Sequence, residues 1–231
     1  MSGTSSDPPI RDAATIVLVR NCAAGPTVLM GQRGAKAAFM ASKFVFPGGA
    51  VDPTDADLPD CPPMKPLAQN QLSEHGNGAA PTALANAAIR ELWEETGLML
   101  GHSHTKPASV PEDWSTFYRA GYVPAVDRLH FFFRAVTPPG RPRRFDARFF
   151  IASAEDLAGD ADDFSQASGE LSALQWVALN EARNLPLPFI TELVLAEVAT
   201  MLDDIHAPRD VPFFNHGENG PEFRAILAPS A

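Results

Sequence analysis

The stretch Ala87–Gly97, AAIRELWEETG, constrains the fold of this 231-residue chain more than any other segment. At about 100° per residue along a helix, Glu91, Glu94 and Glu95 fall within one narrow wedge. The opposite side of the helix is apolar and carries Ala85, Ile89, Leu92 and Trp93. Gly97 is a residue type that commonly ends helices. The sequence therefore predicts an amphipathic helix that buries its apolar face, presents three carboxylates and stops at Gly97.

The position of these carboxylates, in the last two turns, is unfavourable for an isolated helix. The helix dipole is negative at this end, where lysine or arginine is favoured over glutamate. Divalent cations would remove the repulsion, because Mg²⁺ and Mn²⁺ prefer carboxylate oxygens as ligands. The acidic wedge has two interpretations, a metal site or an ordinary solvated helix face.

A second motif lies upstream, where Phe46-Pro47-Gly48-Gly49 leads into an acidic turn. Together with the helix it resembles the Nudix box, in which a glycine, five residues, a glutamate and seven residues precede Arg-Glu-apolar-x-Glu-Glu-x-Gly-apolar. The residues that match the fixed positions are Gly49, Arg90, Glu91, Leu92, Glu94, Glu95, Gly97 and Leu98. By this resemblance the chain is identified as a member of the Nudix hydrolase superfamily.

The chain departs from the box in two ways. Asp55 stands where the box has its first glutamate, and it lies 35 positions before Arg90 instead of 8. The difference corresponds to 27 inserted residues, which we place around residues 56–81. Prolines interrupt this segment, although residues 67–73 could form one or two helical turns. Such a segment is either a lid or substrate wall, or a solvated elaboration without a catalytic role.

The resemblance implies an α/β fold, the α/β/α Nudix sandwich, with a mixed β-sheet between helices. Apolar and β-branched runs predict strands at 13–20, 27–33, 44–46, 129–136, 144–152 and 171–177, and helical periodicity predicts helices at 82–96 and 188–205. The expected organisation is a flexible tail at 1–12, a Nudix hydrolase domain at 13–206 with its insertion at 56–81, and a C-terminal extension at 207–231 that wraps the domain or a dimer partner.

The resemblance also implies roles for individual residues. Glu91, Glu94 and Glu95 would hold Mg²⁺ or Mn²⁺, with Asp55 as a further ligand through water. Arg90 would orient the carboxylates by bidentate hydrogen bonding, which makes it the fourth catalytic residue. The general base stays open between Glu91, Glu170 and the Asp162-Asp163 segment. The residues expected to bind substrate are Arg33, Phe46, Gly48, Gly49 and Arg144.

Two of these substrate-binding assignments rest on patterns outside the box. The distance from Arg33 to Phe46 is similar to that in the extra motif of coenzyme A diphosphatases, but Ala38 and Ser42 stand where that motif has a second arginine and a glycine. In the predicted strand at 144–152, Arg144, Asp146 and Arg148 share one face. This row is either a structural ion-pair ladder or a means of bringing Arg144 to a substrate phosphate.

The activity implied by the resemblance is metal-dependent hydrolysis of a diphosphate linkage in a nucleoside diphosphate joined to another moiety. Coenzyme A or acyl-CoA is the favoured substrate, because residues 29–55 and 137–150 look like the branch that contains the peroxisomal acyl-CoA diphosphatases. ADP-ribose, NADH and dinucleoside polyphosphates are the alternatives. A non-catalytic Nudix domain that binds a nucleotide is the alternative from another class, although such domains usually lose box glutamates that are present here.

Charge and composition narrow the partners and the location. The net charge is −10 and the pI is about 5.0, so attraction to nucleic acid or to an anionic membrane is not expected. Cys22 and Cys61 are too few for a disulfide framework, and the N-terminus lacks the apolar core of a signal peptide. We therefore expect a cytoplasmic protein that binds a small nucleotide-type molecule, with a homodimer as an open expectation.

Overall fold

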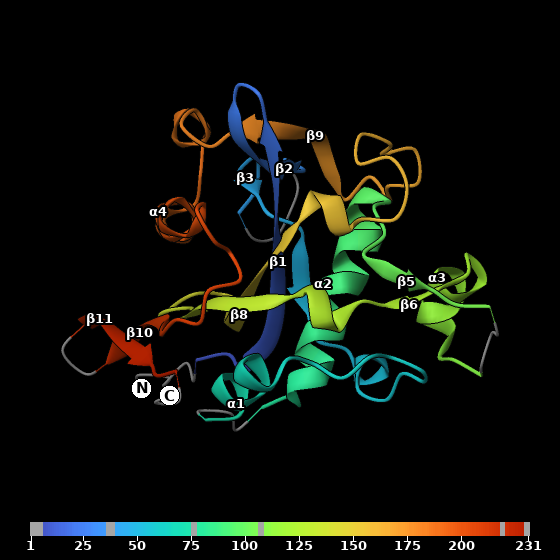
Figure 1. Cartoon of the computed structure of the whole chain (residues 1–231). Helices are drawn as coiled ribbons and strands as arrows, with labels where there is room; N and C mark the ends of the chain where they lie inside the picture. Colours follow the sequence, from blue (N-terminus) through green and yellow to red (C-terminus); the bar gives the residue numbers. More distant parts are fainter. Residues whose placement is uncertain (1–6, 36–39, 75–77, 106–108, 218–219, 229–231) are drawn as a thin grey trace.

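A mixed β-sheet of nine strands forms the centre of the computed structural model (Figure 1). The structure describes residues 7–35, 40–74, 78–105, 109–217 and 220–228, so Ala38 lies outside the described residues. The strands of this sheet are β1 (Ile10–Cys22), β2 (Gly25–Arg33), β3 (Phe44–Val45), β4 (Gly48–Ala50), β7 (His130–Val136), β8 (Arg144–Ser153), β9 (Leu171–Ala178), β10 (Val211–Gly217) and β11 (Gly220–Ile226).

The order of the strands places β1 near the middle of the sheet. The path is β11-β10-β7-β8-β1-β2-β3, with β4 paired to β1 and β9 paired to β2. β1 runs parallel to β8, and β10 runs parallel to β7. The remaining pairs are antiparallel, which makes the sheet mixed as expected.

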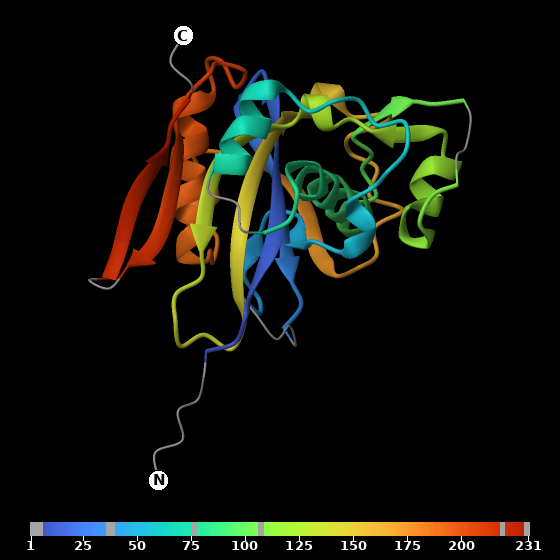
Figure 2. The same ribbon diagram turned by 90° about the horizontal axis from the view of Figure 1, so that it is seen from below.

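Helices cover both faces of the sheet. α2 (Pro81–Thr96) and the shorter α1 (Pro66–Glu74) pack on one face, and α4 (Phe189–Met201) packs on the other. Figures 1 and 2 show α2 and α4 on opposite sides of β1. This is the α/β/α sandwich that the resemblance implies, so the expected fold class is confirmed.

The alternation of side chains along β1 explains why both faces need a helix. Ile16 and Leu18 belong to the core cluster that contains α2, whereas Val17 and Val19 belong to the cluster that contains α4. All four side chains are buried. Because both faces of β1 are covered, side chains that point to either face are apolar. The strand therefore appears in the sequence as an uninterrupted hydrophobic run.

The helix α2 ends where the sequence predicts. α2 stops at Thr96, and Gly97 adopts a left-handed conformation with φ of 76°. The Gly97 N–H donates to the carbonyl oxygen of Trp93 at 2.8 Å, which satisfies one of the last free carbonyls of the helix. At the other end, Pro81 occupies the first turn, where a missing N–H carries no penalty.

Two segments differ from the sequence-based expectations in their secondary structure. β1 begins at Ile10, so part of the segment expected to be a tail belongs to the sheet. The C-terminal extension forms the hairpin β10–β11, and β10 joins the sheet through parallel pairing with β7. Prolines are tolerated there because the hairpin lies at the edge of the sheet. The extension therefore adds strands at the sheet edge, where only a wrapping segment had been expected.

The inserted segment contains α1, which covers and slightly exceeds the turns predicted at 67–73. A separate two-stranded sheet of β5 (Gly101–Ser103) and β6 (Tyr122–Pro124) flanks the far side of α2, with α3 (Ser115–Arg119) between its strands in the chain. Among the helices of the described residues, none has the length and hydropathy required to cross a bilayer.

Candidate active site

The strand β4, which contains Gly48 and Gly49, and the end of α2 meet at the centre of the predicted site. Gly48 pairs with Thr15 of β1, and its N–H donates to Oε2 of Glu95 at 2.9 Å. A Cβ on Gly49 would collide with the carboxylate of Glu91. Gly49 is required because the Glu91 carboxylate lies directly against its backbone, whereas a Cβ on Gly48 would collide with Ala14 and Thr15 of β1.

Arg90 hydrogen-bonds to two of the three glutamates and to the backbone of β4. Its Nη1 donates to Oε1 of Glu91 at 3.0 Å and to Oε2 of Glu94 at 3.1 Å. Its Nη2 donates to the carbonyl oxygen of Ala50 at 3.0 Å, in β4 next to Gly49. The guanidinium therefore ties α2 to β4 and orients two of the three glutamates, as the resemblance implies.

Asp55 lies behind Arg90 and is completely buried. Its Oδ1 accepts from Arg90 Nε at 2.9 Å and from Trp114 Nε1 at 3.2 Å. Its Oδ2 accepts from Arg90 Nη2 at 3.1 Å and from the Asp52 N–H at 2.9 Å. Both oxygens are occupied by protein donors, so this carboxylate anchors Arg90 and is not presented as a metal ligand in this conformation.

The backbone around Asp55 is held as firmly as its side chain. The Asn86 side chain on α2 donates to the Asp55 carbonyl oxygen at 2.9 Å. Asp55 also closes a short 3₁₀ turn, Pro53–Asp55, that follows the extended residue Asp52. This packing explains how the box keeps its geometry across the insertion, because both sides of the inserted segment are anchored at α2.

The three glutamates differ in exposure, and burial raises the pKa of each one. The Glu94 side chain is 41% exposed and Glu91 is 14% exposed, whereas Glu95 retains only 2% of its accessible surface. Burial raises the pKa of Glu91 to about 7, although the Arg90 charge acts in the opposite direction. Burial likewise raises the pKa of Glu95 to about 8, against the lowering effect of the Gly48 hydrogen bond. Burial raises the pKa of Glu94 as well.

Carboxylates with raised pKa values that share one site favour a bound divalent cation, because the cation compensates both burial and mutual repulsion. Within the described ranges, however, no three histidine, cysteine or acidic side chains surround one point as metal ligands do. Glu91 and Glu94 converge on Arg90, while Glu95 turns toward Gly48. The donor chemistry therefore fits Mg²⁺ or Mn²⁺, and binding would require side-chain rotation, most simply of the exposed Glu94.

Arg33 and Glu170 lie at the edge of this group. Arg33 Nη2 donates to Oε1 of Glu170 at 3.0 Å, linking the end of β2 to the residue before β9. The charge of Glu170 contributes to the raised pKa values of both Glu91 and Glu95, which places it close to them. The structure therefore brings one expected substrate residue and one candidate general base to the glutamates.

Two of the expected substrate residues lie elsewhere. Phe46 is only 4% exposed and packs in the core cluster beneath α4, on the opposite face of the sheet from α2. Arg144 donates from Nε to the Thr137 carbonyl oxygen at 3.2 Å and pairs with Asp7 at 3.4 Å. These contacts hold Arg144 to the turn before β8.

The other charged residues of β8 form an ion-pair ladder, one of the two interpretations left open by the sequence. Arg134 of β7 donates two hydrogen bonds to Asp146, at 2.9 and 2.6 Å. Arg148 lies 3.3 Å from Asp146 and also pairs with Asp12 of β1. The ladder crosses three strands of the sheet and has a structural role.

Sequence reasoning missed two side chains that build the site from outside the box. Trp114 and Asn86 both hydrogen-bond to Asp55, one through its carboxylate and the other through its backbone. The sequence did carry a signal for Trp114, because a buried indole N–H needs an acceptor. Which acceptor it reaches is a property of the tertiary structure.

Comparison of the sequence with known proteins identifies the same family that the motif resembles. Residues 81–197, about half of the chain, match the family model described as "NUDIX domain". The Caenorhabditis elegans protein "Putative nudix hydrolase 7" is 30% identical in an alignment 202 residues long that covers 79% of this chain and 59% of that protein. The chain thus spans less than two thirds of the length of this relative.

A solved structure supports the same conclusion. The crystal structure of a NUDIX hydrolase from Alicyclobacillus acidocaldarius aligns with a TM-score of 0.63 at 26% sequence identity, covering 86% of this chain and 97% of that chain. The family model begins at the first residue of α2, so it includes the helix with Arg90, Glu91, Glu94 and Glu95. The chain belongs to the Nudix hydrolase family.

Proposed function

We propose that this protein hydrolyses a diphosphate linkage in a nucleoside diphosphate joined to another moiety, using Mg²⁺ or Mn²⁺ held by Glu91, Glu94 and Glu95. One observation carries the proposal. Three carboxylates with raised pKa values occupy the negative end of α2, and two of them, Glu91 and Glu95, lie against the glycines of β4. A helix that needed only solubility would gain nothing from this arrangement.

The chemistry follows from the charge of the substrate. A diphosphate repels an attacking water, and bound Mg²⁺ or Mn²⁺ supplies positive charge to the phosphate oxygens and activates that water. Arg90 holds Glu91 and Glu94 in place through hydrogen bonds from a single nitrogen, Nη1. Asp55 in turn holds Arg90, so we assign it this anchoring role in preference to that of a ligand.

We assign Glu170 as the first candidate for the general base, with Glu91 as the alternative. Glu170 is exposed, lies near Glu91 and Glu95, and is positioned by Arg33. Glu91 is engaged by Arg90 and packed on Gly49, so it has less freedom to accept a proton from water. If Glu170 is the base, a Glu170→Gln variant should lower kcat at least about a hundredfold and keep the wild-type affinity for Mn²⁺.

Coenzyme A or acyl-CoA is the leading substrate in this proposal. The support is the spacing between Arg33 and Phe46, together with the position of Arg33 beside Glu170 at the edge of the site. Arg33 would bind a phosphate of the substrate in exchange for Glu170, as guanidinium geometry allows, and this exchange would free the Glu170 carboxylate to accept a proton. Phe46 is assigned a core role because its side chain is buried beneath α4.

The test is a panel of diphosphate compounds incubated with Mg²⁺ or Mn²⁺, with the products separated by chromatography. The panel contains coenzyme A, an acyl-CoA, ADP-ribose, NADH and a dinucleoside tetraphosphate. Glu94→Gln should keep the fold, since Glu94 is the most exposed of the three, and should lower the rate at least about a hundredfold. Glu192→Gln, an exposed position on α4, is the matched control and should keep the wild-type rate. Wild-type turnover in Glu94→Gln would contradict the metal assignment.

A further inference from the structure

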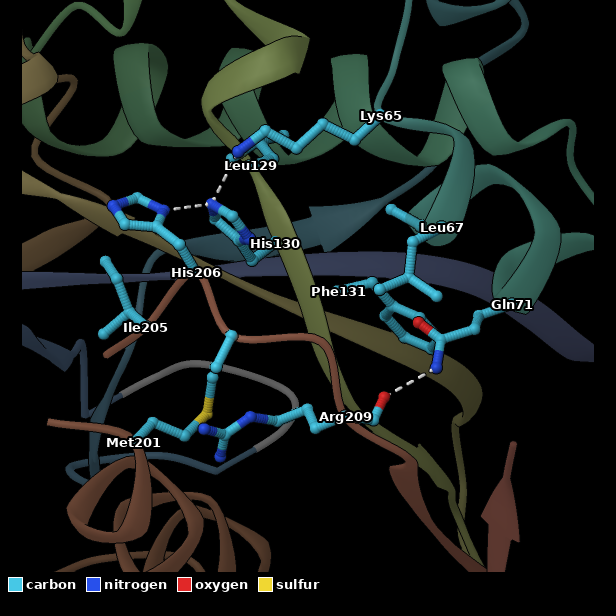
Figure 3. Close-up of a pocket in the computed structure, with 12 residues that line it drawn as sticks. Lys65, Leu67, Gln71, Leu129, His130, Phe131, Met201, Ile205, His206 and Arg209 are labelled. Carbon is cyan, nitrogen blue, oxygen red and sulfur yellow. Dashed lines mark hydrogen bonds between the residues drawn. The ribbon is translucent and has the colours of Figure 1, made fainter. Parts of the chain in front are cut away.

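A cavity of about 270 Å³ lies at the edge of the sheet, away from the glutamates (Figure 3). It is bounded by α1, by the first residues of β7, by the end of α4 and by the segment that leads to β10. None of the residues that line it belongs to β4 or to the acidic face of α2. The cavity is therefore a separate site, and its inner wall includes the helix within the insertion.

One side of the cavity concentrates basic nitrogens. Lys65 Nζ lies 2.9 Å from Nε2 of His130, and Nδ1 of His206 lies 2.6 Å from the same nitrogen. Figure 3 shows the three side chains converging on this point. A neutral imidazole has one lone pair, so His130 Nε2 cannot accept from both neighbours at full strength. An added acceptor at this point would satisfy the donor that is left over.

The pKa values of these groups are consistent with crowding by positive charge. Burial, followed by the charges of Lys65 and His206, lowers the pKa of His130 to about 4, with Asp204 acting in the opposite direction. Burial also lowers the pKa of Lys65. The acids that act on Lys65 from nearby, Asp127 and Asp156, already pair with Arg128.

Arg209 adds a second cation with incomplete hydrogen bonding. Its Nε is buried and has no hydrogen-bond partner among the described residues. Its Nη2 reaches only the Asp204 carbonyl oxygen, at 3.5 Å. Among the ion pairs of the described ranges, none joins a carboxylate to Lys65 or to Arg209. In a chain of net charge −10, two cations that line one cavity without a carboxylate partner are unusual.

The remaining wall of the cavity is apolar. Leu67 comes from α1, Leu129 and Phe131 flank His130, and Met201 and Ile205 close the opposite side. In Figure 3 the Arg209 side chain points across this wall toward Met201. An occupant must therefore offer both an oxyanion for the basic side and a short apolar part for the other.

We infer that this cavity is a binding site for a small amphipathic oxyanion, a phosphate or carboxylate group carried on a short apolar chain. The anion would accept hydrogen bonds from Lys65 and His206, with Arg209 adding positive charge from the opposite wall, and the chain would pack against Leu67, Phe131 and Met201. Metal binding is disfavoured because lysine and arginine supply the surrounding charge. Bound ligand would link α1 of the insertion to the segment after α4.

The experiment uses the full chain without divalent cations, in EDTA, so that the glutamate site contributes no affinity for anions. Three probes of similar length are titrated, namely pentyl phosphate, hexanoate and neutral hexan-1-ol. Binding is followed through the imidazole proton resonances of His130 and His206, assigned with His130→Gln and His206→Gln. The expected result is that at least one anion shifts both resonances and binds at least about tenfold more tightly than hexan-1-ol. Whichever anion binds more tightly identifies the headgroup.

Arg209→Met tests the source of the selectivity, because it keeps the apolar stem and removes the charge. It should weaken the anion at least about tenfold and leave hexan-1-ol unchanged. Arg224→Met is the matched control, since that arginine is exposed on β11 and pairs with Glu222. Lys65→Met supplies an independent variant if Arg209→Met folds poorly. Equal binding of hexan-1-ol and the anions, unshifted histidine resonances, or unchanged anion affinity in both variants would each overturn the inference.

Discussion

Arg90 donates two parallel hydrogen bonds to the fully buried carboxylate of Asp55, from Nε at 2.9 Å and from Nη2 at 3.1 Å. The two residues lie 35 positions apart in the chain. A shorter acid than the glutamate of the Nudix box thus makes a bidentate pair with the arginine that orients Glu91 and Glu94. The pair joins the two halves of the box across the insertion.

Asp55→Asn should destabilise the protein by about 3 kcal/mol, because it removes the fully buried carboxylate from the ion pair with Arg90. Chemical denaturation followed by circular dichroism measures the change. Asp52→Asn is the control, since Asp52 is half exposed and lies 3.6 Å from Arg90, and should cost less than about 1 kcal/mol. Equal effects of the two substitutions would contradict the anchoring role of Asp55.

Gly49→Ala should lower the hydrolysis rate at least about tenfold, because the new Cβ displaces the Glu91 carboxylate from its place against β4. Steady-state kinetics with the best substrate of the panel measures this change, and calorimetry should show weaker Mn²⁺ binding. Gly34→Ala is the control, because a Cβ there meets nothing within 4 Å. If Gly49→Ala kept both rate and affinity, Glu91 would not need its observed position.

Metal binding should release protons near neutral pH. Glu91 and Glu95, with pKa values of about 7 and about 8, retain protons at pH 7 that must leave when their oxygens bind a cation. Calorimetric titration with Mn²⁺ in buffers of different ionisation enthalpy should show release of roughly one proton at pH 7 and almost none at pH 9.5. Absence of buffer dependence at pH 7 would show that the glutamates bind the metal without titrating.

The metal-free protein should lose stability as pH rises. The folded pKa of Glu95 lies above that of an unfolded glutamate, so the folded state keeps a proton that the unfolded state releases. The contribution of Glu95 to the free energy of unfolding is therefore greatest below about pH 4.5 and is lost as the pH rises to about 8.

Glu95→Gln removes this titrating group while keeping an acceptor for the Gly48 N–H. In EDTA it should stabilise the protein at pH 8 on the order of 2 kcal/mol and flatten the dependence on pH. Thermal unfolding across this range provides the measurement, with Glu192→Gln as the exposed control. A variant that is no more stable than wild type at pH 8 would mean that Glu95 is ionised at little cost.

The sequence was sufficient for those features that depend on neighbouring residues. Periodicity predicted α2 and its apolar face, and Gly97 ended the helix as expected. The acidic wedge, which was expected to be presented, is instead partly packed away, because Glu95 is buried against Gly48. The glycine pair was recognisable from adjacent residues, although the structure places it in the strand β4. Local geometry determines these features, because residues three or four positions apart share a helix face whatever the rest of the chain does.

Only the tertiary structure showed which distant groups meet. Asp55 accepts hydrogen bonds from Arg90 and Trp114, and Phe46 packs beneath α4. The C-terminal extension became β10 and β11 because the edge of β7 offered free hydrogen-bonding groups, a property that no local pattern in residues 207–231 records. Contacts over such separations depend on how the sheet is ordered and on where each loop returns, and a single sequence read by local periodicity does not contain that information.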